Sequence, residues 1–195
     1  MKTKIITIML FSIAYLCNAQ TTPPVKRKAN VDFDAYEKLI PKVKAHRKNK
    51  LVDLPTFLKM AAEKGTVILD TRSDSLYKRK HVKGAIHLNF SDFTQQNLLR
   101  LIPSADTRIL IYCNNNFVDD AANFASKVVV PVLVKKKIAP ISLALNIPTY
   151  INLYGYGYRN VYELSELVST LDERITFEGT HVKNIAVNAQ ALKVN

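Results

Sequence analysis

Two short runs of apolar, mostly β-branched residues constrain the fold more than any other feature of the chain. They span 66–70 (Thr-Val-Ile-Leu-Asp) and 108–112 (Arg-Ile-Leu-Ile-Tyr), with helix-like stretches around them. Continuous apolar runs of this length are typical of strands buried on both faces. Strands that alternate with helices predict an α/β fold, with a mostly parallel central sheet and helices on both faces. In such folds functional sites form at the carboxyl ends of the strands.

The remaining pattern predicts four further elements. We expect an extended piece at 51–53, a helix from Pro55 to Ala62 that Gly65 ends, a helix over 92–101 that Pro103 ends, and an extended segment at 160–162. With 195 residues, of which 48% are hydrophobic, a single folded domain is expected.

The first 19 residues have the layout of a secretory signal peptide. Lys2 and Lys4 precede an apolar run over 5–16, and small residues stand at positions 17 and 19, before Gln20. We therefore expect cleavage before Gln20 and export to the periplasm or the medium. A retained membrane helix and a lipid anchor on Cys17 are the alternatives. The run is shorter than the roughly 20 residues that span a bilayer, so no stable membrane span is expected after cleavage.

Cleavage would leave one cysteine, Cys113, because the other is Cys17. An internal disulfide is then excluded. A single thiol in an exported protein is buried, paired between chains or used chemically. A covalent dimer through Cys113 is one of these alternatives.

Residues 20–50 are strongly basic and account for much of the formal net charge of +12. Phe33, Tyr36, Ile40 and Val43 recur at helical spacing, which predicts an amphipathic helix that is interrupted or entered at Pro41. The segment is either a solvated basic face that packs one apolar stripe on the domain, or a surface for an acidic partner at the cell envelope. No base-reading motif is present, so no nucleic-acid partner is expected.

Cys113 follows the apolar run 108–112 directly, which places it at the end of a predicted strand. Asn114, Asn115 and Asn116 come next, and such turn-prone residues are suited to exposing backbone N–H groups around a sulfur. A reactive thiolate and an inert thiol that ends a strand are both compatible with this position.

Several motifs, in order, resemble the rhodanese-like domain family. They are an apolar strand ending in Asp70-Thr71-Arg72, the aromatic Tyr77, His81-Val82-Lys83-Gly84-Ala85, the strand ending in Cys113, and the segment 157–164. The resemblance covers about 51–170, and we set the domain at 51–171, with a C-terminal tail at 172–195.

The resemblance implies a sulfurtransferase. Cys113 would be the nucleophile, which takes a sulfane sulfur from a thiosulfate-like anion and passes it as a persulfide to cyanide or a thiol. Asn114, Asn115, Asn116 and Arg72 would bind the substrate, with a structural Asp70–Arg72 pair as the alternative role of that arginine. His81 and Gly84 would hold a turn. Asp70, His81 and Gly84 are therefore expected to be structural residues of the motif. No cofactor and no metal are expected. A phosphatase variant would carry Arg at the sixth position after the cysteine, where this chain has Asp119.

The chain departs from the family pattern after the cysteine, where an insertion at about 117–142 enlarges the loop. In one register the following helix has Asn146 as its N-cap, with Thr149 and Leu153 facing the core; an alternative places a short helix at Asp120–Lys127. The insertion is either a lid, with lysines 135–137 supplying positive charge, or a peripheral excursion. Asp119 and Asp120 would disfavour a thiolate if they lay close to it. The alternative function is therefore a catalytically silent binding module at the envelope.

Overall fold

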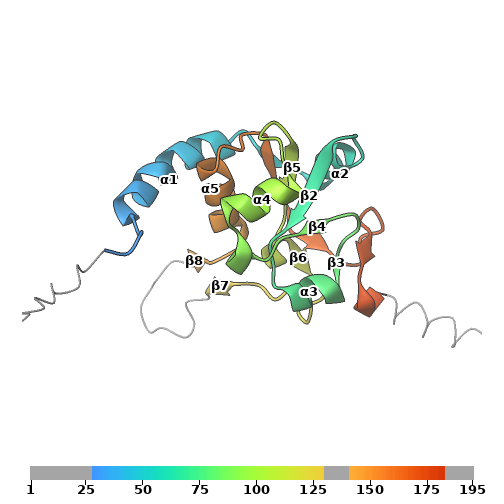
Figure 1. The fold of residues 1–195 in the computed structure, drawn as a ribbon. Helices are drawn as coiled ribbons and strands as arrows, with labels where there is room; N and C mark the ends of the chain where they lie inside the picture. Colours follow the sequence, from blue (N-terminus) through green and yellow to red (C-terminus); the bar gives the residue numbers. More distant parts are fainter. Residues whose placement is uncertain (1–27, 130–140, 183–195) are drawn as a thin grey trace, which may run out of the picture. The chain divides into compact units, whose positions relative to one another are not determined.

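Five parallel strands form the centre of the fold (Figure 1). The computed structural model describes residues 28–129 and 141–182, and from Phe33 onward they belong to one compact unit. The strand order is β1-β9-β5-β2-β4, and all neighbours run parallel. The strands are β1 (Leu51–Val52), β2 (Thr66–Asp70), β4 (Ile86–His87), β5 (Arg108–Ile111) and β9 (Val161–Leu164). The predicted α/β class with a mostly parallel sheet is confirmed.

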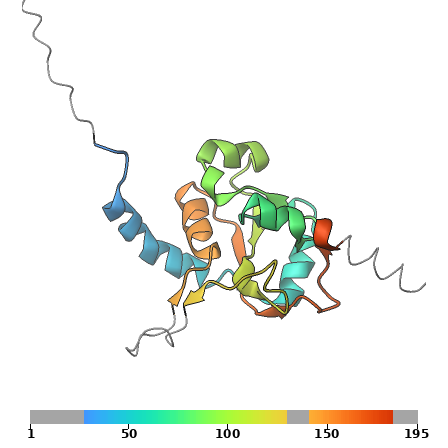
Figure 2. The ribbon, with the colours of Figure 1, turned by 90° about the horizontal axis from the view of Figure 1, so that it is seen from below.

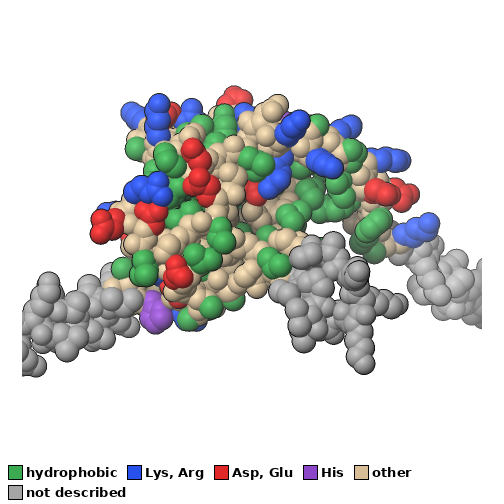
Figure 3. Space-filling view, turned by 180° about the vertical axis from the view of Figure 1, so that it is seen from behind, with side chains coloured by type: hydrophobic (Ala, Val, Ile, Leu, Met, Phe, Trp, Pro, Cys, Tyr) green, Lys and Arg blue, Asp and Glu red, His purple; other side chains and the backbone are tan. Residues whose placement is uncertain are grey.

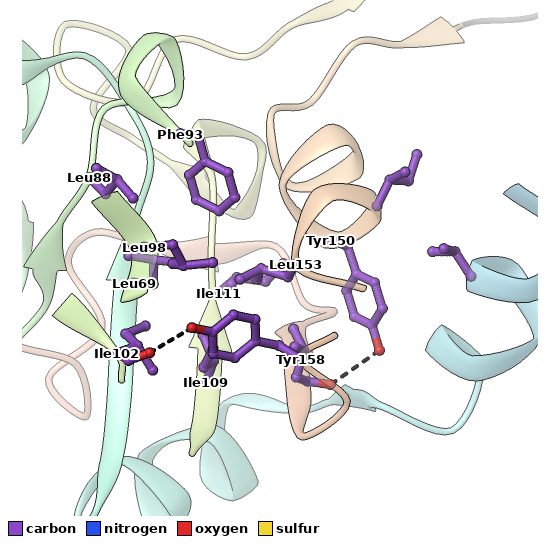
Figure 4. Packing of buried hydrophobic residues seen from close by; sticks show 13 residues of the cluster. Leu69, Leu88, Phe93, Leu98, Ile102, Ile109, Ile111, Tyr150, Leu153 and Tyr158 are labelled. Atoms are coloured by element: carbon purple, nitrogen blue, oxygen red, sulfur yellow. Dashed lines mark hydrogen bonds between the residues drawn. The ribbon is translucent and has the colours of Figure 1, made fainter. Parts of the chain in front are cut away.

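Helices cover both faces of this sheet because side chains alternate along its central strands. Leu69, Ile109 and Ile111 pack on one face, under α1 (Phe33–Arg47), α4 (Gln95–Leu101) and α5 (Asn146–Gly155). Figure 4 shows this cluster, in which the Tyr158 hydroxyl donates to the Ile102 carbonyl at 2.6 Å. The other face packs under α2 (Leu54–Ala61) and α3 (Asp74–Arg79).

Two of the predicted helices start elsewhere than expected. Helix α2 begins at Leu54, because the Asp53 carboxylate caps it by accepting the Thr56 N–H at 2.9 Å. The helix expected over 92–101 is divided: 90–92 form a short 3-10 turn (η1, Phe90–Asp92), and α4 starts after Thr94, whose hydroxyl caps the Asn97 N–H.

Helix α1 corrects two expectations. It runs unbroken through Pro41, so this proline neither interrupts nor opens the helix. Of the predicted apolar stripe only Val43 is buried, while Phe33, Tyr36 and Ile40 are exposed. The helix is held to the domain at its carboxyl end, where Arg47 forms an ion pair with the buried Glu163.

The 3-10 turn η2 (Asn114–Asn116) precedes the insertion expected at about 117–142. Strand β6 (Phe117–Val118) then pairs with β10 (Val168–Ser169), and β7 (Val128–Val129) pairs with β8 (Ile141–Ser142). Residues 120–124 form a turn closed on the Asp120 carbonyl and 125–127 follow without regular structure, so the alternative helix expected at 120–127 is wrong. The α5 register is correct within one residue, since Leu145 is the N-cap and Thr149 and Leu153 are buried. Lysines 135–137 and the signal peptide predicted over 1–19 lie outside the described residues.

Part of the expected C-terminal tail packs on the domain. Ile175 is buried, and β11 (Phe177–Glu178) pairs antiparallel with β3 (His81–Val82). Among residues 28–129 and 141–182, no helix has the length and apolar character needed to cross a membrane.

Candidate active site

Cys113 lies two residues beyond the end of β5, at the carboxyl edge of the sheet. Asn116, at the end of turn η2, fixes the backbone around it. The Asn116 Oδ1 accepts the Cys113 N–H at 2.9 Å, while its Nδ2 donates to the carbonyls of Leu164 (2.7 Å) and Glu166 (3.2 Å). The cysteine is therefore anchored to the end of the neighbouring strand β9.

The thiol faces the start of α5. The Leu145 N–H donates to Cys113 Sγ at 3.2 Å, and Leu145 is the residue that caps this ten-residue helix. The partial positive charge of a helix N-terminus favours an anion at that place. Cys113 is only 1% exposed, so its sulfur lies beneath the surface of the loop.

Arg72 is buried beside this loop with all its donors engaged. Its Nε donates to the Asp70 carboxylate and its Nη2 to Asp70 and the Lys80 carbonyl. Its Nη1 donates to Asn114 Oδ1 (3.3 Å) and to the Asn123 carbonyl (3.1 Å). A guanidinium has five N–H groups, and these contacts use them all. The geometry thus favours the structural Asp70–Arg72 pair over direct binding of a substrate by Arg72.

A tyrosine completes the Asp70–Arg72 pair. The Tyr112 hydroxyl donates to Asp70 Oδ2 at 2.5 Å and accepts the Val82 N–H at 3.1 Å. Burial, and then the negative charge of Asp70, raise the pKa of Tyr112 well above its ordinary value. Burial alone would lower the pKa of Arg72, but its hydrogen bonds to Asp70 and the charge of Asp70 outweigh this and raise it. Both groups therefore keep their protons at neutral pH.

The other two asparagines connect the loop to its surroundings. Asn114 is buried and contacts Arg72, as described above. Asn115 accepts the Lys127 N–H at 2.9 Å and donates to Ser142 Oγ at 3.2 Å, which joins the loop to the β7–β8 pair. The asparagine side chains serve as structural links in these contacts.

The acidic residues of the insertion have partners of their own. Asp120 forms an ion pair with Lys80 at 3.0 Å and accepts hydrogen bonds from Asn123. Burial tends to raise the pKa of Asp120, but these hydrogen bonds and the charge of Lys80 lower it. Asp119 accepts a hydrogen bond from Ser169 at 2.7 Å.

A small cavity of about 120 Å³ opens beside the loop. Two residues next to the sulfur line this cavity. Asn114 follows Cys113 in the chain, and Leu145 donates its N–H to Cys113 Sγ. Two cations, Arg72 and Lys127, also line it, with Ser73 and Leu76 completing the wall. An anion in this cavity would lie next to the cysteine loop, near Lys127 and near Arg72, whose charge is paired with that of Asp70.

A comparison with models of protein families identifies the domain. The family model for the rhodanese-like domain matches residues 53–166, which is more than half of the chain. The chain belongs to the rhodanese-like domain family. A search of curated proteins finds no match.

Three solved structures resemble this rhodanese-like domain distantly. The Alr3790 protein from Anabaena sp. is 17% identical, with 72% of this chain and 90% of that chain covered and a TM-score of 0.44. The BH2092 protein from Bacillus halodurans is 20% identical, covering 76% and 86%, with a TM-score of 0.41. A polysulfide-sulfur transferase homodimer from Wolinella succinogenes is 15% identical, covering 73% and 93%, with a TM-score of 0.33.

The predicted turn residues of the rhodanese-like domain lie around Tyr77. Its ring stacks between His81 and His87, with centroids 3.9 and 4.4 Å away, and His81 Nδ1 contacts the Tyr77 carbonyl at 2.7 Å. Gly84 has a φ of 77°, which favours glycine. The cavity beside Cys113 has neither His81 nor Gly84 in its lining. Among the described residues no cluster of His, Cys, Asp or Glu could hold a metal ion.

Sequence reasoning missed two groups at this site. The Leu145 N–H is a backbone donor, and its approach to the sulfur depends on the path of the whole insertion. Lys127 reaches the cavity because its own N–H is held by Asn115, 12 residues earlier. The only signal in the sequence was the predicted register of this helix, which set its N-cap at Asn146, next to Leu145.

Proposed function

We propose that this rhodanese-like domain is a sulfurtransferase that carries a sulfane sulfur on Cys113. The observation that carries the proposal is the position of the thiol, which accepts the N–H at the start of α5 next to a cavity lined by two cations. A thiolate and its persulfide are both anions, so the same N–H and helix N-terminus would stabilise each of them.

The reaction takes place in two displacements. The Cys113 thiolate attacks the outer sulfur of thiosulfate, a new S–S bond forms, and sulfite leaves with the electron pair of the old S–S bond. Cyanide or a thiolate then attacks the outer sulfur of the persulfide, and Cys113 leaves as a thiolate. Lys127 and Arg72 would attract the donor anion, with Lys127 making the direct contact because the Arg72 donors are all engaged.

The test is thiocyanate formation from thiosulfate and cyanide. We expect the wild type to turn over and Cys113→Ser to fall to the rate without protein, while both unfold at similar temperatures. A wild type that does no better than Cys113→Ser would refute the proposal.

Burial of the sulfur favours a second candidate function. With Cys113 at 1% exposure, a donor reaches the sulfur only if the loop opens. A domain whose loop stays closed would be a binding module that holds a small anion in the cavity without chemistry. Thiosulfate would then stabilise the protein but leave no sulfur on Cys113.

We further propose that the protein acts outside the cytoplasm after cleavage before Gln20, on the strength of the sequence pattern at residues 1–19. The mass of the protein recovered from an exporting host tests this. A mass that equals that of residues 20–195 would support export, and a mass that equals that of residues 1–195 would contradict it.

A further inference from the structure

Helix α1 carries an apolar stripe that the rest of the described chain after it, 48–129 and 141–182, leaves uncovered. Phe33, Tyr36 and Ile40 lie on one side of the helix at spacings of three and four residues, and they are 74%, 38% and 42% exposed. In Figures 1 and 2, α1 lies along α5, with its amino-terminal half extending beyond the rest of this unit. Three large apolar side chains on one exposed helix face indicate a contact surface.

A groove continues this stripe toward the carboxyl end of α1. It is a cavity of about 280 Å³ between α1 and α5, with Val43, Tyr150 and Ile151 on its floor. The side chain of Ile147, 43% exposed, forms one wall, and Lys44 and Arg47 stand at the rim. Figure 3 shows hydrophobic side chains on the inner side of α1 and Lys or Arg side chains along its outer edge.

The charges of α1 are divided between its ends. In the first half, Asp34 and Glu37 outnumber the single cation Lys38, whereas the second half carries Lys42, Lys44 and Arg47 and no acidic residue. Two parallel copies of such a helix would repel each other, but two antiparallel copies place the acidic half of each against the basic half of the other. The charge pattern therefore fits a second copy of the same chain in antiparallel orientation.

The spacing along the helix supports one register of that pairing. Phe33 and Arg47 each lie seven residues from Ile40, which is about 10 Å at 1.5 Å per residue. With Ile40 on the two-fold axis, Phe33 of one copy lies level with Arg47 of the other, over the groove. Glu37 and Lys44 lie two turns apart on the same flank of the stripe. In the antiparallel pair, Glu37 of one copy therefore comes within one residue of the level of Lys44 of the other copy.

We propose that the α1 stripe and the α1–α5 groove form a two-fold interface between two copies of this chain. Phe33 of each copy enters the groove of the other, where Lys44 and Arg47 offer cations to its ring. Glu37 of each copy pairs with Lys44 of the other. This inference does not depend on the sulfurtransferase activity.

Charge reversal tests the interface directly. We expect the purified full chain, in reductant, to show a concentration-dependent doubling of mass by sedimentation equilibrium. Glu37→Lys and Lys44→Glu should each weaken association by about tenfold or more, because like charges then meet twice across the axis. An equimolar mixture of these two variants should associate again, since both contacts across the axis of the mixed dimer then join opposite charges. The double variant should associate too, because it exchanges the two charges of each pair.

The matched control is Lys38→Glu, which makes the same change in charge on another side of α1 and should leave association unchanged. A wild type that stays monomeric at all concentrations would overturn the proposal. So would a dimer that both single reversals leave intact, or a mixture that fails to associate. A dimer that reductant or Cys113→Ser abolishes would also overturn it, since the contact would then be a disulfide.

Discussion

At the scale of single residues, Arg72 shows how the site is supported. It is 2% exposed, and it places one guanidinium against the Asp70 carboxylate and two backbone carbonyls while reaching Asn114 in the cysteine loop. A buried ion pair of this kind adds little stability over apolar residues, but losing one member leaves a buried charge unpaired. Arg72 therefore matters for the position of the loop more than for contact with a substrate.

Replacing Arg72 with Met should lower the free energy of unfolding by about 3–5 kcal/mol, because Asp70 keeps its charge without its partner. Urea denaturation measures this. The double variant Asp70→Asn with Arg72→Met should recover part of the loss. If Arg72→Met were as stable as the wild type and only raised KM for thiosulfate, Arg72 would be a substrate ligand and our account of it would be wrong.

The Leu145 N–H can be removed without disturbing the backbone around it. Leu145 has a φ of −67°, which matches the value that proline imposes, and it lies at the start of α5, where proline is tolerated. Leu145→Pro should slow persulfide formation about tenfold or more, since a hydrogen bond to a charged group is worth about 1.5–3 kcal/mol. Stopped-flow measurement of sulfite release tests this. Leu145→Ala keeps the N–H and should react near the wild-type rate; equal rates for both variants would exclude the role of the N–H.

At the scale of elements, some parts could be predicted from the sequence and others could not. The two central strands followed from their apolar runs, because burial on both faces leaves a local signature. The start of α4 did not, since the Thr94 cap competes with Asp92 and only the fold decides between them. Cys113 at a strand end was visible in the sequence, whereas the N–H···S contact joins residues 32 positions apart.

Helix α1 illustrates a different limit. Its period predicted an amphipathic helix correctly, but a period does not say what covers the apolar side. The structure buries Val43 in the core and leaves Phe33, Tyr36 and Ile40 exposed, so most of the predicted stripe is a surface. Besides the buried Val43, the contacts that anchor the helix are polar: Arg47 pairs with Glu163, and His46 contacts the Tyr150 hydroxyl at 2.9 Å.

This anchor gives α1 a dependence on pH. Partial burial and the nearby charges of Lys50 and Arg159 lower the pKa of His46 below its ordinary 6.5. The unfolded chain then binds the proton more readily, so the contribution of neutral His46 is present above about pH 6.5 and is lost as the pH falls below it. The protection factors of the α1 amides, which correct for the slower intrinsic exchange at lower pH, should therefore decrease between pH 7 and pH 5.5. His46→Gln should flatten that dependence; an unchanged profile in the variant would show that another group is responsible.

At the scale of the whole molecule, the cavity couples ligand binding to stability. It is lined by β2–α3 residues, the cysteine loop, the α5 start and Lys127 of the insertion, so an anion there contacts segments that are far apart in the chain. A ligand that binds only the folded state raises the free energy of unfolding by about 2.7 kcal/mol at one hundred times its Kd. This increase in the free energy of unfolding should be measurable even when no persulfide forms.

Thiosulfate should accordingly raise the melting temperature of Cys113→Ser, which cannot form a persulfide. Adding Lys127→Gln should remove most of this increase, because the exposed cation at the cavity is lost. Lys64→Gln is the matched control, since Lys64 lies before β2, at the opposite edge of the sheet. If thiosulfate raised the melting temperature equally in both lysine variants, the anion would bind elsewhere.

The central claim is that Cys113 carries sulfur, and the mass of the intact protein tests it most directly. After incubation with thiosulfate and removal of small molecules, we predict a gain of one sulfur atom that mild reductant reverses. Cys113→Ser should show no gain under the same conditions. A wild type whose mass stays unchanged, or a gain that persists in Cys113→Ser, would contradict the account.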